Sequence, residues 1–246
     1  MTNHHEHANL IWQIADLLRG PYRPPQYERV MLPMTILRRF DCVLAPTKTK
    51  VLAECERRKG GKLSDDALDR VLNNAAKQRF HNHSPLTFEK LKGDPDNIDK
   101  HLVSYINGFS ANVRRIFEYF EFPTEIEKMR EANILYLVVS KFCDVDLHPD
   151  NVPNEEMGLI FENLIRRFNE LANETAGDDS LKQAAVVNPK DKFELVFKNL
   201  LETLFVERMD QNEEIFARFM NDAAFQKVVT DWLASEAYQR LRNEAG

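Results

Sequence analysis

Apolar residues recur at helical spacing along most of the chain, and this periodicity limits the possible folds more than any other feature. Residues three or four positions apart share one face of an α-helix. The clearest stripe lies between residues 154 and 177 and consists of Met157, Ile160, Phe161, Leu164, Ile165, Phe168 and Leu171. Asn154 stands where a helix cap is expected, and Gly177 stands where the helix would end. The stripe therefore predicts one long amphipathic helix.

Comparable stripes predict helices through the rest of the first 177 residues. They are expected before Gly20, over residues 25–44 with a kink or division at Pro33, after a cap at Ser64, after Asp94, over residues 113–120 and over residues 125–142. No segment alternates in the manner of a strand, and the 8 glycines among 246 residues are too few for many turns. We therefore expect an all-α protein, a helical bundle without a Rossmann-type sheet.

The pattern changes after Gly177. Residues 179–191 show no amphipathic period and predict a connector between a first domain, residues 1–178, and a tail of three short helices, residues 192–246. Stripes of large apolar residues most often form a core, but three short helices bury little surface by themselves. The tail residues that we regard as candidate subunit contacts are Met209, Phe216, Phe219, Met220, Phe225, Trp232 and Tyr238.

The formal net charge of −6 does not favour nucleic-acid binding by the whole surface, but it permits a local basic face. A flexible basic loop is expected at residues 46–50, and pairs of arginines recur along the helices. The candidate DNA-contacting residues are Arg23, Arg38, Arg39, Lys48, Lys50, Arg114 and Arg115. The competing interpretation is that these residues lie on ordinary solvated helix faces, because most of the pairs have acidic neighbours.

Motifs for catalysis, cofactors and metals are absent from the sequence. Residues 60–63 read Gly-Gly-Lys-Leu, with Leu where a phosphate loop needs a hydroxyl, so a loop before a helix is expected there. The aspartates between residues 144 and 150 lack the Gly and Glu positions of a calcium loop and predict a solvated loop. His81 and His83 have no further ligand at zinc-site spacing. We expect no catalytic centre, no cofactor and no metal.

The cysteines and the hydropathy point to the cytoplasm and away from the membrane. Cys42, Cys55 and Cys143 form no CxxC pair, and an odd number of cysteines without a secretory signal is typical of reduced thiols. The most apolar run, residues 134–139, is far too short to cross a bilayer.

Three long segments of the first domain carry a resemblance to a known family. They are residues 10–20 (LIWQIADLLRG), residues 27–40 (YERVMLPMTILRRF) and residues 157–178, which begin MGLIFE and end AGD. In these segments residues 1–178 resemble the helical N-terminal domain of HsdM, the modification (methyltransferase) subunit of type I restriction-modification systems. The resemblance implies contacts with the specificity, modification and motor subunits, and a domain that closes over double-stranded DNA in the assembled enzyme.

The tail resembles a different subunit. Residues 193–197 (FELVF) and 208–222 (RMDQNEEIFARFMND) look like the C-terminal end of HsdR, the restriction (motor) subunit, and the similarity extends over residues 188–246. In that family a helical tail docks the motor subunit onto the methyltransferase. The resemblance therefore implies that the tail of this chain docks onto its own first domain, where a short tether gives an effective concentration on the order of millimolar.

The catalytic domain of the modification subunit has no counterpart in the sequence. In the HsdM family a Gly-Asp pair leads into a His-Phe-Thr-Pro-Arg-Glu segment, whereas Asp178 is followed by Asp-Ser-Leu. Asn188 and Pro189 lack the second proline and the aromatic residue of an adenine-holding Asn-Pro-Pro-Tyr/Phe loop. We therefore expect a non-catalytic assembly protein with an accessory DNA contact. The alternatives are a DNA-clamping fragment of an adenine-N6 methyltransferase subunit, or an active methyltransferase, which the missing motifs disfavour.

Overall fold

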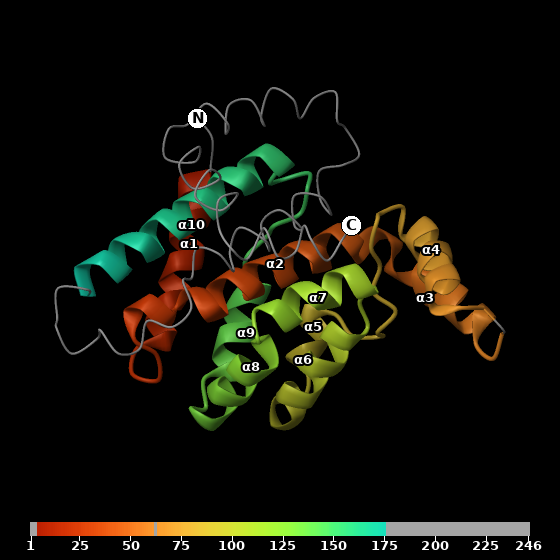
Figure 1. Cartoon of the computed structure of the whole chain (residues 1–246), viewed down its shortest axis with the longest axis horizontal. Helices are drawn as coiled ribbons and strands as arrows, with labels where there is room; N and C mark the ends of the chain where they lie inside the picture. The colour runs from red at the N-terminus through yellow and green to blue at the C-terminus, as the bar shows by residue number, and fades with distance from the viewer. Residues whose placement is uncertain (1–3, 62, 176–246) are drawn as a thin grey trace, which may run out of the picture. The chain divides into compact units, whose positions relative to one another are not determined.

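The computed structural model of the chain describes residues 4–61 and 63–175, and these residues are mostly helical (Figure 1). The α-helices are α1 (His4–Ile14), α2 (Glu28–Leu44), α3 (Lys48–Arg58), α4 (Asp65–Ala76), α5 (Phe88–Leu91), α6 (Ile98–Asn107), α7 (Ala111–Tyr119), α8 (Phe122–Glu131), α9 (Leu135–Cys143) and α10 (Asn154–Thr175). Short 3-10 helices lie at Ala15–Leu18, Pro24–Gln26, Ala45–Thr47 and Pro95–Asn97. Within the described ranges there is no strand, only two isolated bridges, so the all-α prediction is confirmed.

Helix α2 is the central element of this part of the chain. Most of its residues are buried, and it packs against α8, α9 and α10 (Figure 1). Pro33 does not divide the segment, because α2 runs through it as one element, and Pro33 itself is buried. A helix that is apolar on most sides is stable only inside a protein, which explains its central position.

A chain of aromatic rings fills the space between α2 and the helices α5 to α8. Phe40 of α2 lies 4.5 Å from Phe80 and 6.0 Å from Phe109, measured between ring centroids. Phe109 lies 5.3 Å from the ring of Tyr105, in an edge-to-face arrangement, and 6.2 Å from Phe117. Burial of each such side chain contributes roughly 1.5–3 kcal/mol to folding.

The long helix predicted for residues 154–177 is present as α10, and its stripe is buried as expected. Met157, Ile160, Leu164 and Phe168 are at most 2% exposed, and the Phe168 ring lies 5.3 Å from that of Trp12 in α1. The pair α1 and α10 therefore closes one side of the domain.

The boundary between α8 and α9 differs from the sequence prediction. The segment 125–142, expected as one element, is divided between α8 and α9 at Asn133, whose φ of 57° is left-handed. Asparagine tolerates this conformation better than most residues. Pro123 lies in the first turn of α8, where proline needs no hydrogen-bond partner.

Helices α3 and α4 form a hairpin at one end of α2 (Figure 1). Its turn contains Gly60, at a φ of 79°, and α4 is capped by Ser64, whose hydroxyl accepts a hydrogen bond from Ala67 N at 3.3 Å. The predicted turn and cap are confirmed. The flexible basic loop expected at residues 46–50 is wrong, because α3 begins at Lys48, directly after the 3-10 turn at Ala45–Thr47. None of the helices in the described ranges has the length and hydropathy needed to cross a membrane.

Candidate functional site

Arg39 is buried in the domain. Its side chain is 0% exposed, and Nη1 donates to the carbonyl oxygens of Leu147 at 2.5 Å and Val152 at 2.7 Å. Nη2 donates to Oδ1 of Asn154 at 2.7 Å, so this predicted cap residue serves as a partner of Arg39. Burial lowers the pKa of Arg39 to about 10. The arginine joins α2 to the loop before α10, and this corrects the expectation that it belongs to a basic surface.

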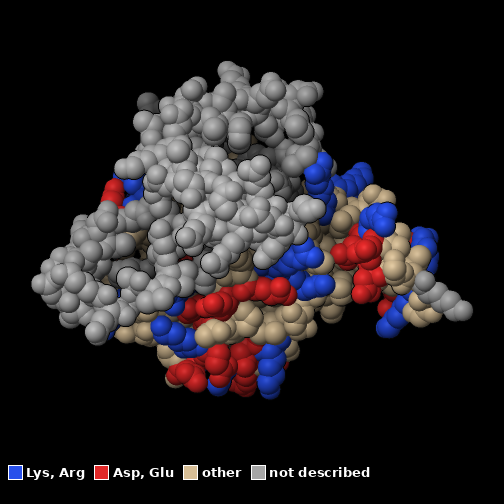
Figure 2. Space-filling model, in the orientation of Figure 1, with Lys and Arg blue, Asp and Glu red and all other residues tan. Residues whose placement is uncertain are grey.

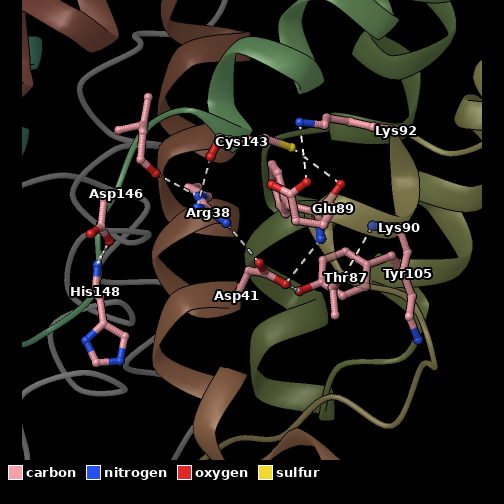
Figure 3. A network of polar contacts seen from close by, with 12 residues as sticks. Arg38, Asp41, Thr87, Glu89, Lys90, Lys92, Tyr105, Cys143, Asp146 and His148 are labelled. Atoms are coloured by element: carbon pink, nitrogen blue, oxygen red, sulfur yellow. Dashed lines mark hydrogen bonds and ion pairs between the residues drawn. The ribbon is translucent and has the colours of Figure 1, made fainter.

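Arg38 is also engaged inside the fold (Figure 3). Its Nε donates to Val145 O at 2.8 Å, Nη2 donates to Cys143 O at 3.1 Å, and Nη1 donates to Oδ2 of Asp41 at 3.1 Å. Oδ1 of Asp41 accepts a 2.7 Å hydrogen bond from the hydroxyl of Tyr105. Burial, followed by the charge of Asp41, raises the pKa of Tyr105. This network fixes α9 and α6 to α2, and it withdraws Arg38 from the surface as well.

Two of the remaining candidates, Lys48 of α3 and Arg114 of α7, lie near the segment that contains His83. Nζ of Lys48 donates to both oxygens of Asn82, at 3.3 and 3.2 Å, and burial lowers the pKa of Lys48 to about 8. Arg114 donates to Phe109 O. Burial and then Arg114 lower the pKa of His83, and Lys48 acts in the same direction. Both cations therefore lie near His83.

The segment that contains His81 and His83 packs against the C-terminal end of α6. His83 N donates to Gly108 O at 2.8 Å, and Ser110 N donates to His81 O at 3.1 Å. Gly108 approaches the segment so closely that a Cβ there would lie 2.6 Å from Cβ of Ser84. The position of His83 is therefore set by backbone contacts, and its exposed side chain is presented at a fixed place.

Arg79, His83, Arg114 and Arg115 form what we call the α7 basic face. Arg79 O accepts hydrogen bonds from Asn73 Nδ2 at 3.0 Å and Asn112 Nδ2 at 3.2 Å, which brings its backbone to the first turn of α7. Arg79, His83 and Arg115 are exposed, and Arg114 is half-buried. Figure 2 shows Lys and Arg side chains gathered where α7 lies in Figure 1. No ion pair of Arg79 or Arg115 is found within the part of the chain that the structure describes.

Arg79 and His83 are absent from the residues proposed on the sequence. The basic run from Lys77 to His83 contains buried Phe80 and His81, so its exposed positions follow no simple period. The two other candidates lie elsewhere. Arg23 is exposed before the 3-10 turn at Pro24–Gln26, and Lys50 is exposed on α3. No contact between described residues joins either of them to the α7 basic face.

The residues with metal-ligand chemistry do not assemble into a site. Among the described residues no group of three His, Cys, Asp or Glu side chains could hold a metal ion. Asp146 instead accepts hydrogen bonds from His148 N at 2.9 Å and Asn151 Nδ2 at 2.6 Å, within the loop after α9. The predicted loop is confirmed.

The candidate subunit contacts in the tail lie outside the described residues. They are Met209, Phe216, Phe219, Met220, Phe225, Trp232 and Tyr238. The predicted connector, residues 179–191, and the predicted three-helix tail lie outside them as well.

One comparison with known proteins identifies the first part of the chain. No curated protein and no solved structure matches it. A family model described as the HsdM N-terminal domain matches residues 7–142, which include α2 to α8 and the α7 basic face. The match ends before α10 and the tail, so the resemblance of residues 188–246 to HsdR stays a prediction. Because the matched range covers more than half of the 246 residues, the chain belongs to the HsdM N-terminal domain family.

Proposed function

We propose that this chain is a non-catalytic assembly protein of a type I restriction-modification system. The observation that carries the proposal is the HsdM N-terminal match over residues 7–142, in a sequence without the methyltransferase motifs that follow this domain in the family. Membership of this family supports the subunit contact. The resemblance of residues 188–246 to HsdR supports the combination with a motor-subunit tail.

The subunit contact is tested by mixing the full chain with the specificity subunit of a type I system and with the complete modification subunit. Co-elution in size-exclusion chromatography, with a saturable heat in titration calorimetry, is the expected result. If neither subunit binds the chain at any ratio, the assembly role is refuted.

The absence of methyl transfer is a separate part of the proposal. An adenine methyltransferase holds S-adenosylmethionine in a glycine-rich strand-to-helix turn and the flipped base in a separate loop. Neither motif occurs in the sequence, so titration with S-adenosylmethionine should give no heat beyond dilution. Saturable binding of S-adenosylmethionine would require a cofactor site that the known motifs do not describe.

The α7 basic face favours a second function, which is to contact double-stranded DNA as a clamp. Exposed arginines without described carboxylate partners can neutralise phosphates, and each phosphate contact steepens the salt dependence of binding. Arg79 and Arg115 come from separate elements and are both exposed. Both side chains can therefore reach an external phosphate without any change in the fold.

The double variant Arg79→Gln with Arg115→Gln tests the DNA contact. Its affinity for a short duplex of arbitrary sequence should fall, and the slope of log affinity against log salt should become shallower by about two. The matched control is Arg57→Gln with Arg58→Gln on α3, an exposed pair that already contacts Glu54. Equal losses in the two double variants would mean that only the total charge matters and that the α7 basic face is no site.

A further inference from the structure

The carboxylate of Asp69 lies beside the N-terminus of α7, the helix that carries Arg114 and Arg115. Asp69 belongs to α4, and its side chain is 32% exposed. Its Oδ2 accepts a hydrogen bond from Ala111 N, the first residue of α7, at 3.3 Å. Its Oδ1 lies 3.7 Å from Nε2 of His81. The carboxylate thus stands at the positive end of the α7 dipole, where an external anion would otherwise be favoured.

His81 does not neutralise this carboxylate at neutral pH. Nδ1 of His81 lies 2.8 Å from Oδ1 of Asn73, whose amide nitrogen donates to Arg79 O. The amide oxygen is therefore an acceptor, so Nδ1 carries the imidazole proton and Nε2, facing Asp69, carries none. Burial, which outweighs the opposing effect of Asp69, lowers the pKa of His81 to about 4. The carboxylate of Asp69 therefore faces a neutral ring.

The charge of Asp69 acts on the same groups that DNA would meet. It opposes the lowering of the pKa of His83, which burial and Arg114 cause, so it lies within electrostatic reach of His83. The backbone of Arg79 is tied through Asn73 to the same helix, α4. Asp69 is therefore linked to the start of α7, and its helix, α4, is linked to the backbone of Arg79.

We propose that Asp69 is an internal counter-anion of the α7 basic face and limits the affinity of that face for DNA phosphates. The inference rests on the proposed DNA contact and deepens it. Asp69 caps α7 and so fixes the face, and by the same charge it repels the phosphate backbone. An isosteric neutral residue would keep the cap and remove the repulsion.

The test is the affinity of the full chain and its variants for a short duplex of arbitrary sequence at low salt. Asp69→Asn retains an oxygen that can accept the hydrogen bond from Ala111 N. Removal of one charge at several ångströms, across partly screened solvent, should strengthen binding about three- to tenfold. The matched control is Asp66→Asn, which makes the same change of net charge on the exposed first turn of α4 and should have little effect.

A second neutral variant, Asp69→Ser, protects the test against a folding defect in the first, and thermal unfolding checks both. A gain in affinity for Asp69→Asn or Asp69→Ser over Asp66→Asn is the expected result. If the wild-type chain binds DNA and the folded Asp69 variants bind no better than Asp66→Asn, the counter-anion role is overturned while the DNA contact stands. If the wild-type chain and all the variants fail to bind DNA at low salt, both proposals are overturned.

Discussion

At the scale of single residues, Arg38 and Arg39 of α2 form hydrogen bonds inside the fold and not on its surface. The guanidinium of Arg39 is surrounded by neutral oxygens, two from the backbone and one from Asn154. Its position follows from the sequence once α2 is placed in the core, because residue 39 shares a helix face with Leu32 and Ile36. Two adjacent arginines suggest an exposed helix face. Only the helical spacing of Arg39 from Leu32 and Ile36 indicates that its side chain is buried.

Replacement of Arg39 tests this structural role. Arg39→Met preserves much of the side-chain volume but leaves two buried carbonyls and an amide oxygen without their donor. We expect the free energy of unfolding to fall by about 3 kcal/mol, measured by urea denaturation. The exposed Arg58→Met, which removes ion pairs to Glu54, should change it by less than about 1 kcal/mol. Similar losses in both variants would contradict an internal role for Arg39.

Glu28, in the first turn of α2, gives a pH dependence of known sign. Burial raises the pKa of Glu28 to about 7, above its usual value of 4.5. The folded state therefore binds more protons than the unfolded state between these values, and the contribution of Glu28 to stability falls as the pH rises through this range. Glu28→Gln removes the effect. The stability of the variant relative to wild type should rise between about pH 4.5 and pH 7, reaching roughly 1–2 kcal/mol.

The comparison of Glu28→Gln with wild type isolates Glu28 from groups that act in the opposite direction. His81, with its lowered pKa, makes the folded state lose stability as the pH falls from about 6.5 to about 4, because the unfolded state then binds more protons. His81 is the same in both proteins, so its contribution cancels. A stability difference that is constant with pH would show that Glu28 is not buried as described.

At the scale of elements, the amphipathic patterns predict most helices but fewer of their ends. The stripe of α10 and the Ser64 cap of α4 are local signals and are confirmed. The division between α8 and α9 is not visible in the pattern, because the apolar residues continue across Asn133. The contact of Lys48 with Asn82 joins residues that are distant in the sequence, and no local pattern could supply it.

Gly108 makes a close backbone approach to the segment 81–84. Gly108→Ala would place a Cβ 2.6 Å from Cβ of Ser84 and 2.8 Å from Ser84 N, so the segment must move. We expect a loss of about 1–3 kcal/mol of unfolding free energy by denaturant titration. Because the α7 basic face is positioned from this segment, DNA affinity should fall as well.

Gly158→Ala is the matched control, since this glycine lies inside α10 and a Cβ added there would meet no neighbouring atom within 4 Å. The same substitution there should stabilise the chain by about 0.5–1 kcal/mol, because alanine loses less conformational freedom on entering a helix. If the two variants change stability by the same amount and sign, the close approach at Gly108 is not what the structure describes.

At the scale of the whole molecule, the sequence predicts the fold class and the family, and the structure supplies the arrangement of the basic residues. Of the seven candidate DNA contacts, only Arg114 and Arg115 belong to the α7 basic face. Arg38 and Arg39 are used inside, and Lys48 is bonded to Asn82. Charge counts cannot separate these roles because they depend on which side of each helix is covered. The proposed docking of a motor-type tail depends on residues 179–246.

Docking of the tail onto the first domain is tested by a calorimetric titration after the chain is cut within the connector. A protease site inserted near Ser180 would release residues 181–246 from residues 1–177, and the two pieces would be separated and titrated against each other. We expect saturable binding with a stoichiometry of one, because the tail and its receptor would then be two parts of one captured subunit contact. The absence of binding at high concentration would contradict it and leave two independent modules whose partners are other subunits.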